Sequence, residues 1–267
     1  MDDNRQPAGV WLHAVTRDAG PCELDGVAGI GGRAVRTVHA GGLVAVVSSV
    51  DLAQFGEEPL RRNLEDLDWL ETVARAHHSV VETVGRSRPV VPARLTTVYR
   101  DDAGLRAMLE QRRGDFDAVL DRVSGRTEWG VKTYAVPTSE RLSGTPPAET
   151  ARPGTAYLQR RRAQLSAEDQ RWQLAVAGAE EVHAALTGCA AAARRHPPQD
   201  RRLSGRTEPM LLNGAYLVER RDADRFGAAV TAQAARHPGL HLELTGPWPP
   251  YSFVTNEFVT AEEEPPR

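Results

Sequence analysis

The chain has 267 residues, of which 40% belong to the hydrophobic set AVILMFWYC and 26% are charged. This length suffices for one large domain or two ordinary ones that bury roughly 70–75% of the unfolded surface. The formal net charge of -3 argues against a protein that binds duplex nucleic acid, which usually carries a large positive surplus. Lys132 is the only lysine, a bias that fits either a GC-rich genome or arginine forks that pair with carboxylates.

The cysteines and the apolar runs indicate in which cellular compartment the protein is expected. Cys22 and Cys189 lie far apart, without CxxC or Cys/His spacing, so the sequence predicts neither a disulfide scaffold nor a zinc site. The first ten residues lack the apolar core of a secretory signal, and the longest apolar run, 43–47, is far shorter than the ~20 residues that cross a bilayer. We therefore expect a soluble cytoplasmic protein without a lipid membrane partner.

The first half of the chain places strands before helices. Short β-forming runs predict strands, and Gly41-Gly42 between two of them predicts a hairpin. Apolar residues at three- and four-residue steps then predict helices. The elements expected here are strands within 8–50, one helix from about 59 to 85, β-type sequence over 89–99 and a second helix that begins at Asp101 or Asp102 and runs through Leu120.

The second half alternates strands with long helices. Five residues recur every seven positions and predict a helix over about 156–195: Leu158, Leu165, Trp172, Ala179 and Leu186. The companion positions four residues later are apolar only in the second half of this helix, so we expect the Arg-rich first half to protrude. The other elements expected are strand 129–136, an exposed loop over 137–155, strand 210–218, helix 222–236, strand 240–244 and a short terminal strand at Phe253-Val254.

This order of elements is typical of an α+β protein with two domains. The C-terminal half is expected to be a ferredoxin-like sandwich, with helices on one face of a mainly antiparallel sheet and the long helix protruding. The predicted divisions are an N-terminal α+β domain over 1–124, the ferredoxin-like domain over 125–256, in which loop 137–155 is flexible, and an acidic tail over 257–267.

Catalytic and metal-binding patterns are missing from the sequence. The glycines between 26 and 32 precede a β-forming stretch, whereas a dinucleotide-binding fingerprint enters a helix. His77 and His78 are adjacent, about 100° apart on a helix, and cannot share one metal as an i, i+4 pair would. We predict no catalytic residue, cofactor or metal. The rival interpretation is a small-molecule-binding enzyme or sensor that uses the inter-domain cleft, with His77 or His183 as the acid or base.

The segment from Gly246 to Val254 has the composition of a recognition element. It places three aromatic residues among three prolines, directly after a predicted strand. Aromatic rings offer a large contact area, and prolines fix how they are presented. The segment either packs over the end of the C-terminal sheet or turns an aromatic residue toward a partner, and the two alternatives are compatible.

Several stretches resemble the gas vesicle GvpL/GvpF family. In chain order they are Phe55–Glu71 with the Ala76-His77 that follows, Trp129–Tyr134, Ala156–Arg161, Met210–Val218 and Leu244–Phe253. The resemblance covers about residues 10–255, and the last motif, Leu-Thr-Gly-Pro-Trp-Pro-Pro-Tyr-Ser-Phe, is quite specific.

The resemblance implies two domains and a part in making gas vesicles, hollow shells assembled from a small hydrophobic wall protein. It implies an accessory or minor structural component, located at the gas vesicle, that contacts the wall protein and other accessory proteins and is not an enzyme. A soluble partner of an apolar subunit needs exposed apolar anchors. We therefore predict partner-binding roles for Trp248, Tyr251, Leu158, Leu165 and Trp172.

Overall fold

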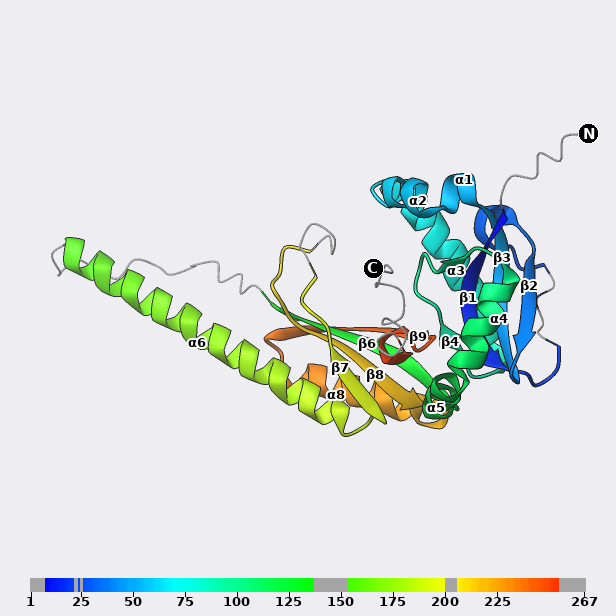
Figure 1. Ribbon diagram of the computed structural model, residues 1–267. Coiled ribbons are helices and arrows are strands. Elements are labelled where there is room, and N and C mark those ends of the chain that lie inside the picture. The colour runs from blue at the N-terminus through cyan, green and yellow to red at the C-terminus, as the bar shows by residue number, and fades with distance from the viewer. Residues whose placement is uncertain (1–7, 22–23, 25, 137–152, 200–205, 255–267) are drawn as a thin grey trace, which may run out of the picture. The chain divides into compact units, whose positions relative to one another are not determined.

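The computed structural model describes residues 8–21, 24, 26–136, 153–199 and 206–254 (Figure 1). Its helices and two antiparallel sheets confirm the predicted α+β class. The chain forms two compact units, one made of residues 1–128 with 247–267 and the other of residues 129–246. The acidic tail and most of the loop predicted over 137–155 lie outside the described residues.

The sheet of the first unit is built around its first strand. The strands are β1 (Ala8–Arg17), β2 (Val35–Ala40), β3 (Leu43–Asp51), β4 (Val91–Pro92) and β5 (Val98–Tyr99). Their order is β2-β3-β1-β4, and β5 also pairs with β1. The predicted hairpin is confirmed, because Ala40 pairs with Leu43 across Gly41 and Gly42, which both have positive φ angles.

Helices cover both faces of this sheet. They are α1 (Leu52–Phe55), α2 (Glu57–Asn63), α3 (Leu67–Ser87), α4 (Asp102–Gln111), α5 (Arg113–Val123) and α9 (Tyr251–Val254), with a 3-10 turn η1 (Ile30–Gly32). Leu105 and Leu109 of α4 and Leu120 of α5 lie in the same core cluster as Leu12. Val80 and Val84 of α3 pack on the other face, against Ala14 and Val46. The alternation of side chains along the strands supplies both apolar faces.

Three of the predicted boundaries in this unit are wrong. The single helix expected over 59–85 is interrupted before Leu67, because the Asp66 carboxylate accepts hydrogen bonds from the backbone N–H groups of Asp68 and Trp69 and starts a new helix. The helix expected from Asp101 or Asp102 divides into α4 and α5 at Arg112. The terminal strand expected at Phe253-Val254 is the last part of the short helix α9.

A buried polar cluster lies between β1, β3 and α3. The Trp11 indole N–H donates to Nδ1 of His77 at 3.0 Å, and Nε2 of His13 lies 2.7 Å from the Ser48 hydroxyl. The two imidazole centroids are 5.2 Å apart. The pairing register of β1 shifts by one residue between Leu12 and Ala14, and His13 is the residue at this irregularity.

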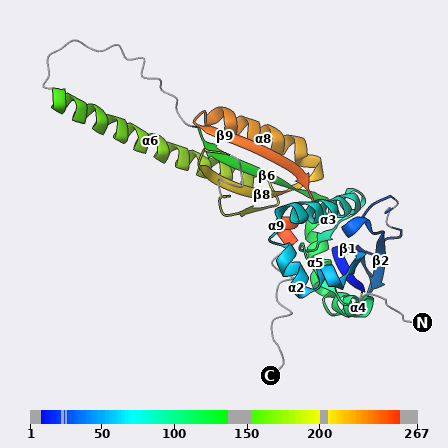
Figure 2. The same cartoon turned by 90° about the horizontal axis from the view of Figure 1, so that it is seen from above.

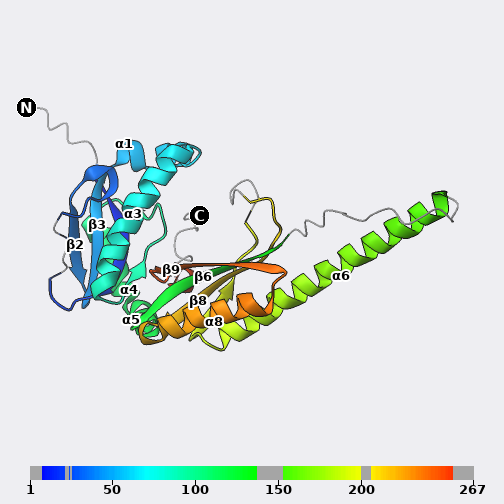
Figure 3. The same ribbon diagram turned by 180° about the vertical axis from the view of Figure 1, so that it is seen from behind.

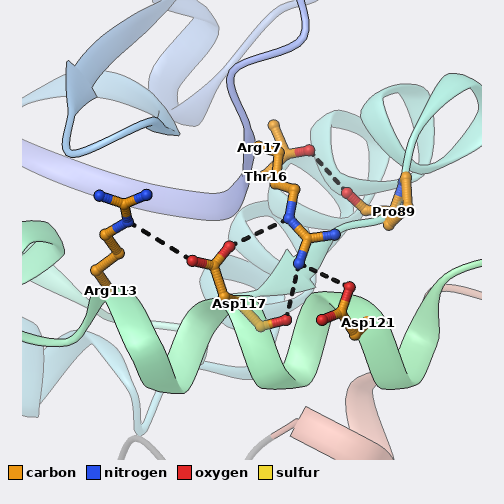
Figure 4. A network of polar contacts seen from close by, with 6 residues as sticks. All are labelled: Thr16, Arg17, Pro89, Arg113, Asp117 and Asp121. Atoms are coloured by element: carbon orange, nitrogen blue, oxygen red, sulfur yellow. Dashed lines mark hydrogen bonds and ion pairs between the residues drawn. The ribbon is translucent and has the colours of Figure 1, made fainter.

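An ion-pair network fastens the end of β1 to α5 (Figure 4). The Arg17 guanidinium donates to the Asp117 carboxylate at 3.1 Å, to the Asp117 carbonyl at 3.0 Å and to the Asp121 carboxylate at 2.8 Å. Arg113 approaches the same Asp117 carboxylate at 3.6 Å. The Thr16 hydroxyl donates to the Pro89 carbonyl at 2.7 Å and so joins β1 to the chain that follows α3. Fork-shaped arginine contacts of this kind fix orientation as well as adding energy.

The second unit has a four-stranded sheet. Its strands are β6 (Arg126–Ala135), β7 (Ala192–Arg195), β8 (Met210–Glu219) and β9 (Leu240–Trp248), in the order β7-β8-β6-β9. Figure 2 shows β6 between β8 and β9. The helices are α6 (Pro153–Thr187) and α8 (Ala223–Arg236), with a 3-10 turn η2 (Arg220–Asp222). Val182 and Leu186 of α6 share one core cluster with Phe226 and Val230 of α8, so both helices cover the same face of the sheet.

The long helix ends earlier than its sequence pattern indicated. We expected it to continue to about residue 195, but α6 ends at Thr187, directly before Gly188. Residues 192–195 instead form the edge strand β7, which pairs antiparallel with β8. An alanine-rich sequence has high helix propensity, and the backbone bonds to β8 override it.

Only the C-terminal part of α6 packs on the sheet. Gly178 is the first buried residue in the described part of the helix, and Ala179, Val182 and Leu186 follow it into the core. The helix continues past the sheet in its N-terminal half, as Figures 1 and 3 both show. The predicted projection of the Arg-rich half is therefore present within this unit.

Because His13 and His77 are buried, we expect the folding stability of the protein to fall in acid. Burial, reinforced by the neighbouring His77, lowers the pKa of His13 to about 3, and burial lowers the pKa of His77 to about 4. Because the unfolded chain binds these protons near pH 6.5 and the folded chain does not, stability falls as the pH drops below 6.5. We expect the free energy of unfolding to decrease by roughly 2 to 3 kcal/mol per pH unit between pH 6 and pH 4.5.

Urea unfolding at a series of pH values measures this slope. His13→Gln should reduce this slope, since it removes one of the two histidines whose pKa burial lowers furthest. His39→Gln serves as the control, because His39 is exposed beside Asp18. A slope that is the same in both variants and the parent chain would contradict the assignment.

Candidate partner-binding surfaces

Trp248, Tyr251 and His78 form an aromatic cluster in the first unit, called here the His78 cluster. The Tyr251 hydroxyl lies 3.3 Å from Nδ1 of His78, and the two rings stack with centroids 5.9 Å apart. The Trp248 ring meets the His78 ring edge-on, with centroids 5.5 Å apart. His78 comes from α3, whereas Trp248 ends β9 and Tyr251 begins α9. The cluster thus brings together residues about 170 positions apart in the sequence.

The two aromatic residues of the C-terminal segment differ in exposure. Trp248 keeps 42% of its surface exposed, whereas Tyr251 is half-buried. Burial raises the pKa of the Tyr251 phenol, and the carboxylates of Glu128 and Glu82 add to the rise. The phenol therefore stays neutral and acts as a hydrogen-bonding group within the fold. Of the two predicted anchors, Trp248 is the one that offers free apolar surface, and Tyr251 orients it through His78.

A buried carboxylate holds the segment in place. Glu128, which is only 8% exposed, accepts hydrogen bonds from the Ser252 backbone N–H at 2.7 Å and from the Ser252 hydroxyl at 2.6 Å. The Arg122 guanidinium donates to the Phe253 carbonyl at 2.7 Å. Val254 lies in the main core cluster of the unit. Hydrogen bonds to a charged acceptor are stronger than neutral ones, so the position of the aromatic residues is well defined.

The other three predicted anchors lie on α6, in the second unit. Leu158, Leu165 and Trp172 are 66%, 46% and 44% exposed. On an α-helix a seven-residue step turns only about 20°, so the three side chains form one line, called here the α6 stripe. Val176, which is also exposed, lies within about 20° of Leu165 and extends this line. Leu174 is exposed as well, but it lies about 180° around the helix from Leu165.

The stripe continues an apolar line that begins in the core. Ala179 and Leu186, the next members of the seven-residue repeat, are buried against the sheet. The same sequence repeat thus supplies core residues at one end of α6 and exposed residues at the other. Exposed apolar surface in this continuous arrangement is typical of a binding site for another protein.

The histidines and glycines considered from the sequence have structural roles. His77 is 3% exposed and is held by Trp11, and Nδ1 of His183 lies 2.8 Å from the Tyr216 hydroxyl. Gly29 leads into the η1 turn before strand β2, and a Cβ at this position would lie 1.9 Å from the Ser48 hydroxyl oxygen. Within the described residues, no group of three His, Cys, Asp or Glu side chains is arranged to hold a metal ion.

A comparison with protein-family models covers the region of the chain that holds both surfaces. The family model for the gas vesicle synthesis protein GvpL/GvpF matches residues 9–255, nearly the whole chain. The chain belongs to the GvpL/GvpF family. Both surfaces lie inside the matched region, and the expectation drawn from the sequence motifs is confirmed.

Curated relatives agree with this family. Gas vesicle protein L of Streptomyces sp. (strain CB03234) is 44% identical over 246 residues, which cover 91% of this chain and 92% of that protein. Gas vesicle protein F2 of Halobacterium salinarum is 28% identical over 234 residues, which cover 86% of this chain and 84% of that protein. The chain is therefore similar along most of its length to proteins named for gas vesicles.

Solved structures agree in fold. The crystal structure of GvpF from Anabaena sp. PCC7120 gives a TM-score of 0.64 at 18% identity and covers 92% of this chain and 96% of that chain. GvpF from Microcystis aeruginosa gives a TM-score of 0.61 at 16% identity, covering 92% and 98%. These likenesses establish a shared fold. A gas vesicle-related role for this GvpL/GvpF protein rests on the family membership.

The structure adds residues that sequence reasoning missed. His78 was weighed only as a metal ligand beside His77, yet its ring joins Trp248 to Tyr251. Glu128 was not singled out, because a lone glutamate in a strand carries no motif.

Among the described residues, no helix is long and apolar enough to cross a membrane.

Removing the buried carboxylate should release the aromatic segment. Glu128→Ala deletes two hydrogen bonds that a buried carboxylate accepts from Ser252, which we expect to cost roughly 2 to 4 kcal/mol of unfolding free energy. Glu71→Ala is the control, because it removes an exposed i, i+4 pair with Arg75 on α3, worth about 0.5 kcal/mol or less. Chemical unfolding monitored by tryptophan fluorescence compares the two. Equal stability of the two variants would contradict the anchoring role.

Proposed function

We propose that this GvpL/GvpF protein is a non-enzymatic accessory or minor structural component of gas vesicles that contacts the small hydrophobic wall protein and supports assembly. The observation that carries the proposal is the α6 stripe, whose apolar side chains remain exposed on a chain of this family. A soluble, charged body with such a surface is suited to hold an apolar subunit.

The proposed contact uses two surfaces. Leu158, Leu165 and Trp172 on α6 provide aliphatic and aromatic contact area, and Trp248, oriented through Tyr251 and His78, provides a separate anchor. Large aromatic residues in a fixed conformation dominate the energy of many protein interfaces. Other gas vesicle accessory proteins are proposed as further partners, and the cytoplasm and the gas vesicle as the location.

We also propose the finer fold assignment made from the sequence. The element order β6-α6-β7-β8-α8-β9, with sheet order β7-β8-β6-β9, supports a ferredoxin-like domain. The proposed divisions are residues 1–124, 125–256 and the tail 257–267. The contact pattern places residues after Gly246 with the first unit, so the end of the second domain is the boundary most in need of a test by limited proteolysis.

Capture of the wall protein tests the function. In co-expression pull-downs washed at high salt, we expect the double variant Trp248→Ala/Leu165→Ala to bind the wall protein about thirtyfold more weakly or worse, since each of the two anchors contributes more than about 1 kcal/mol. Resistance to salt follows from an apolar interface, which charge screening does not weaken.

The matched control is Leu174→Ala. It removes the same side chain from the opposite side of α6, where exposure is 72%. Circular dichroism and thermal unfolding must show that all variants are folded. Unchanged capture by the double variant, or equal losses in Leu165→Ala and Leu174→Ala, would contradict the proposed surfaces.

A further inference from the structure

We infer that the α6 stripe pairs with the α6 stripe of a second copy of this chain, in an antiparallel arrangement centred on Leu165. The inference starts from the charged residues beside the stripe. Arg161 and Glu168 lie about 40–60° to one side of Leu165, and Arg162 and Asp169 lie about 40–60° to the other side. All four are exposed.

These charged side chains have few oppositely charged neighbours on their own helix. Arg161 and Arg162 have no acidic residue three or four positions away in either direction, and Asp169 has no basic residue at those positions. Glu168 has one such neighbour, Arg171. By contrast, helices α2 and α3 pair their exposed charges internally, as in Arg75 with Glu71. The charges beside the α6 stripe therefore suit contacts outside the helix.

An antiparallel two-fold about Leu165 makes these charges complementary. Residues whose numbers add to about 330 then lie opposite each other, so Leu165 meets Leu165 and Leu158 meets Trp172 of the second copy. On one side Arg161 faces Glu168 of the second copy, and on the other Arg162 faces Asp169. A parallel pair would instead place each arginine beside an arginine of the second copy and each carboxylate beside a carboxylate. The sequence thus favours one direction and one register.

The length of the exposed helix fits the same register. Among the side chains that the structure describes, the uncovered part of α6 begins at Tyr157 and runs to Leu174, because Ala175 already packs against the core cluster. Leu165 lies at the middle of this range. When two copies pair about Leu165, Tyr157 of each helix lies opposite Gln173 of the other, directly before the second copy's core begins to cover α6.

The expected association is weak and depends on concentration, because a single pair of helices buries little area compared with a stable dimer. It goes beyond the proposed function and does not require the wall protein. If the wall protein also binds the stripe, as proposed above, the two partners exclude each other at α6, and self-pairing keeps the apolar line covered until the wall protein arrives.

Charge exchange tests the pairing with the full-length chain alone. The acidic variant Arg161→Glu/Arg162→Glu and the basic variant Glu168→Arg/Asp169→Arg each place like charges opposite one another at four contacts. In sedimentation experiments over a concentration series, we expect each variant to self-associate about tenfold more weakly than the parent chain or worse. An equimolar mixture of the two should recover association to within about threefold, because all four contacts are again between opposite charges.

Leu165→Ala should weaken self-association, and Leu174→Ala should leave it unchanged. Circular dichroism confirms that each variant keeps α6. The inference is overturned if the parent chain stays monomeric at the highest concentrations, if the charge variants associate like the parent, or if mixing them restores nothing. Since wall protein is absent, none of these results depends on the outcome of the capture experiment.

Discussion

A seven-residue apolar repeat drifts around a straight α-helix by about 20° per repeat. In α6 this drift helps decide which members of the repeat are buried and which stay exposed. Over the five members from Leu158 to Leu186 the line turns by about 80°. The sheet and α8 cover only its last two members, Ala179 and Leu186. The first three stay exposed, so one sequence feature builds the core of the second unit and also leaves an apolar line uncovered.

The second surface depends on a different constraint. Prolines 247, 249 and 250 stiffen the chain around Trp248, but they do not decide where it points. Its orientation comes from His78 on α3 and from Glu128, which binds Ser252 from more than 120 positions away. The GvpL/GvpF family membership places both surfaces on a protein with a gas vesicle-related role.

Periodicity in the sequence predicted the main strands, the hairpin at Gly41-Gly42 and the partly exposed long helix. It did not predict the interruption before Leu67, because the leucine pattern continues through it and the deciding contact is one Asp66 cap. It also missed β7, since Ala192–Arg195 has helical propensity and becomes a strand only by pairing with β8. The candidate site, too, could be predicted only where a local sequence pattern carries the signal. The exposure of apolar residues on α6 could be predicted from the incomplete repeat, whereas the contacts of His78 depend on the tertiary structure and leave no local signal.

Amide hydrogen exchange along α6, with the chain dilute and with the wall protein added, tests the central claim that the exposed part of the stripe is a protein-binding surface. The account predicts that residues 157–177 gain protection when the wall protein is added, while residues 179–187, already packed on the sheet, change little. Unchanged exchange over 157–177 under conditions where the wall protein is captured would contradict it.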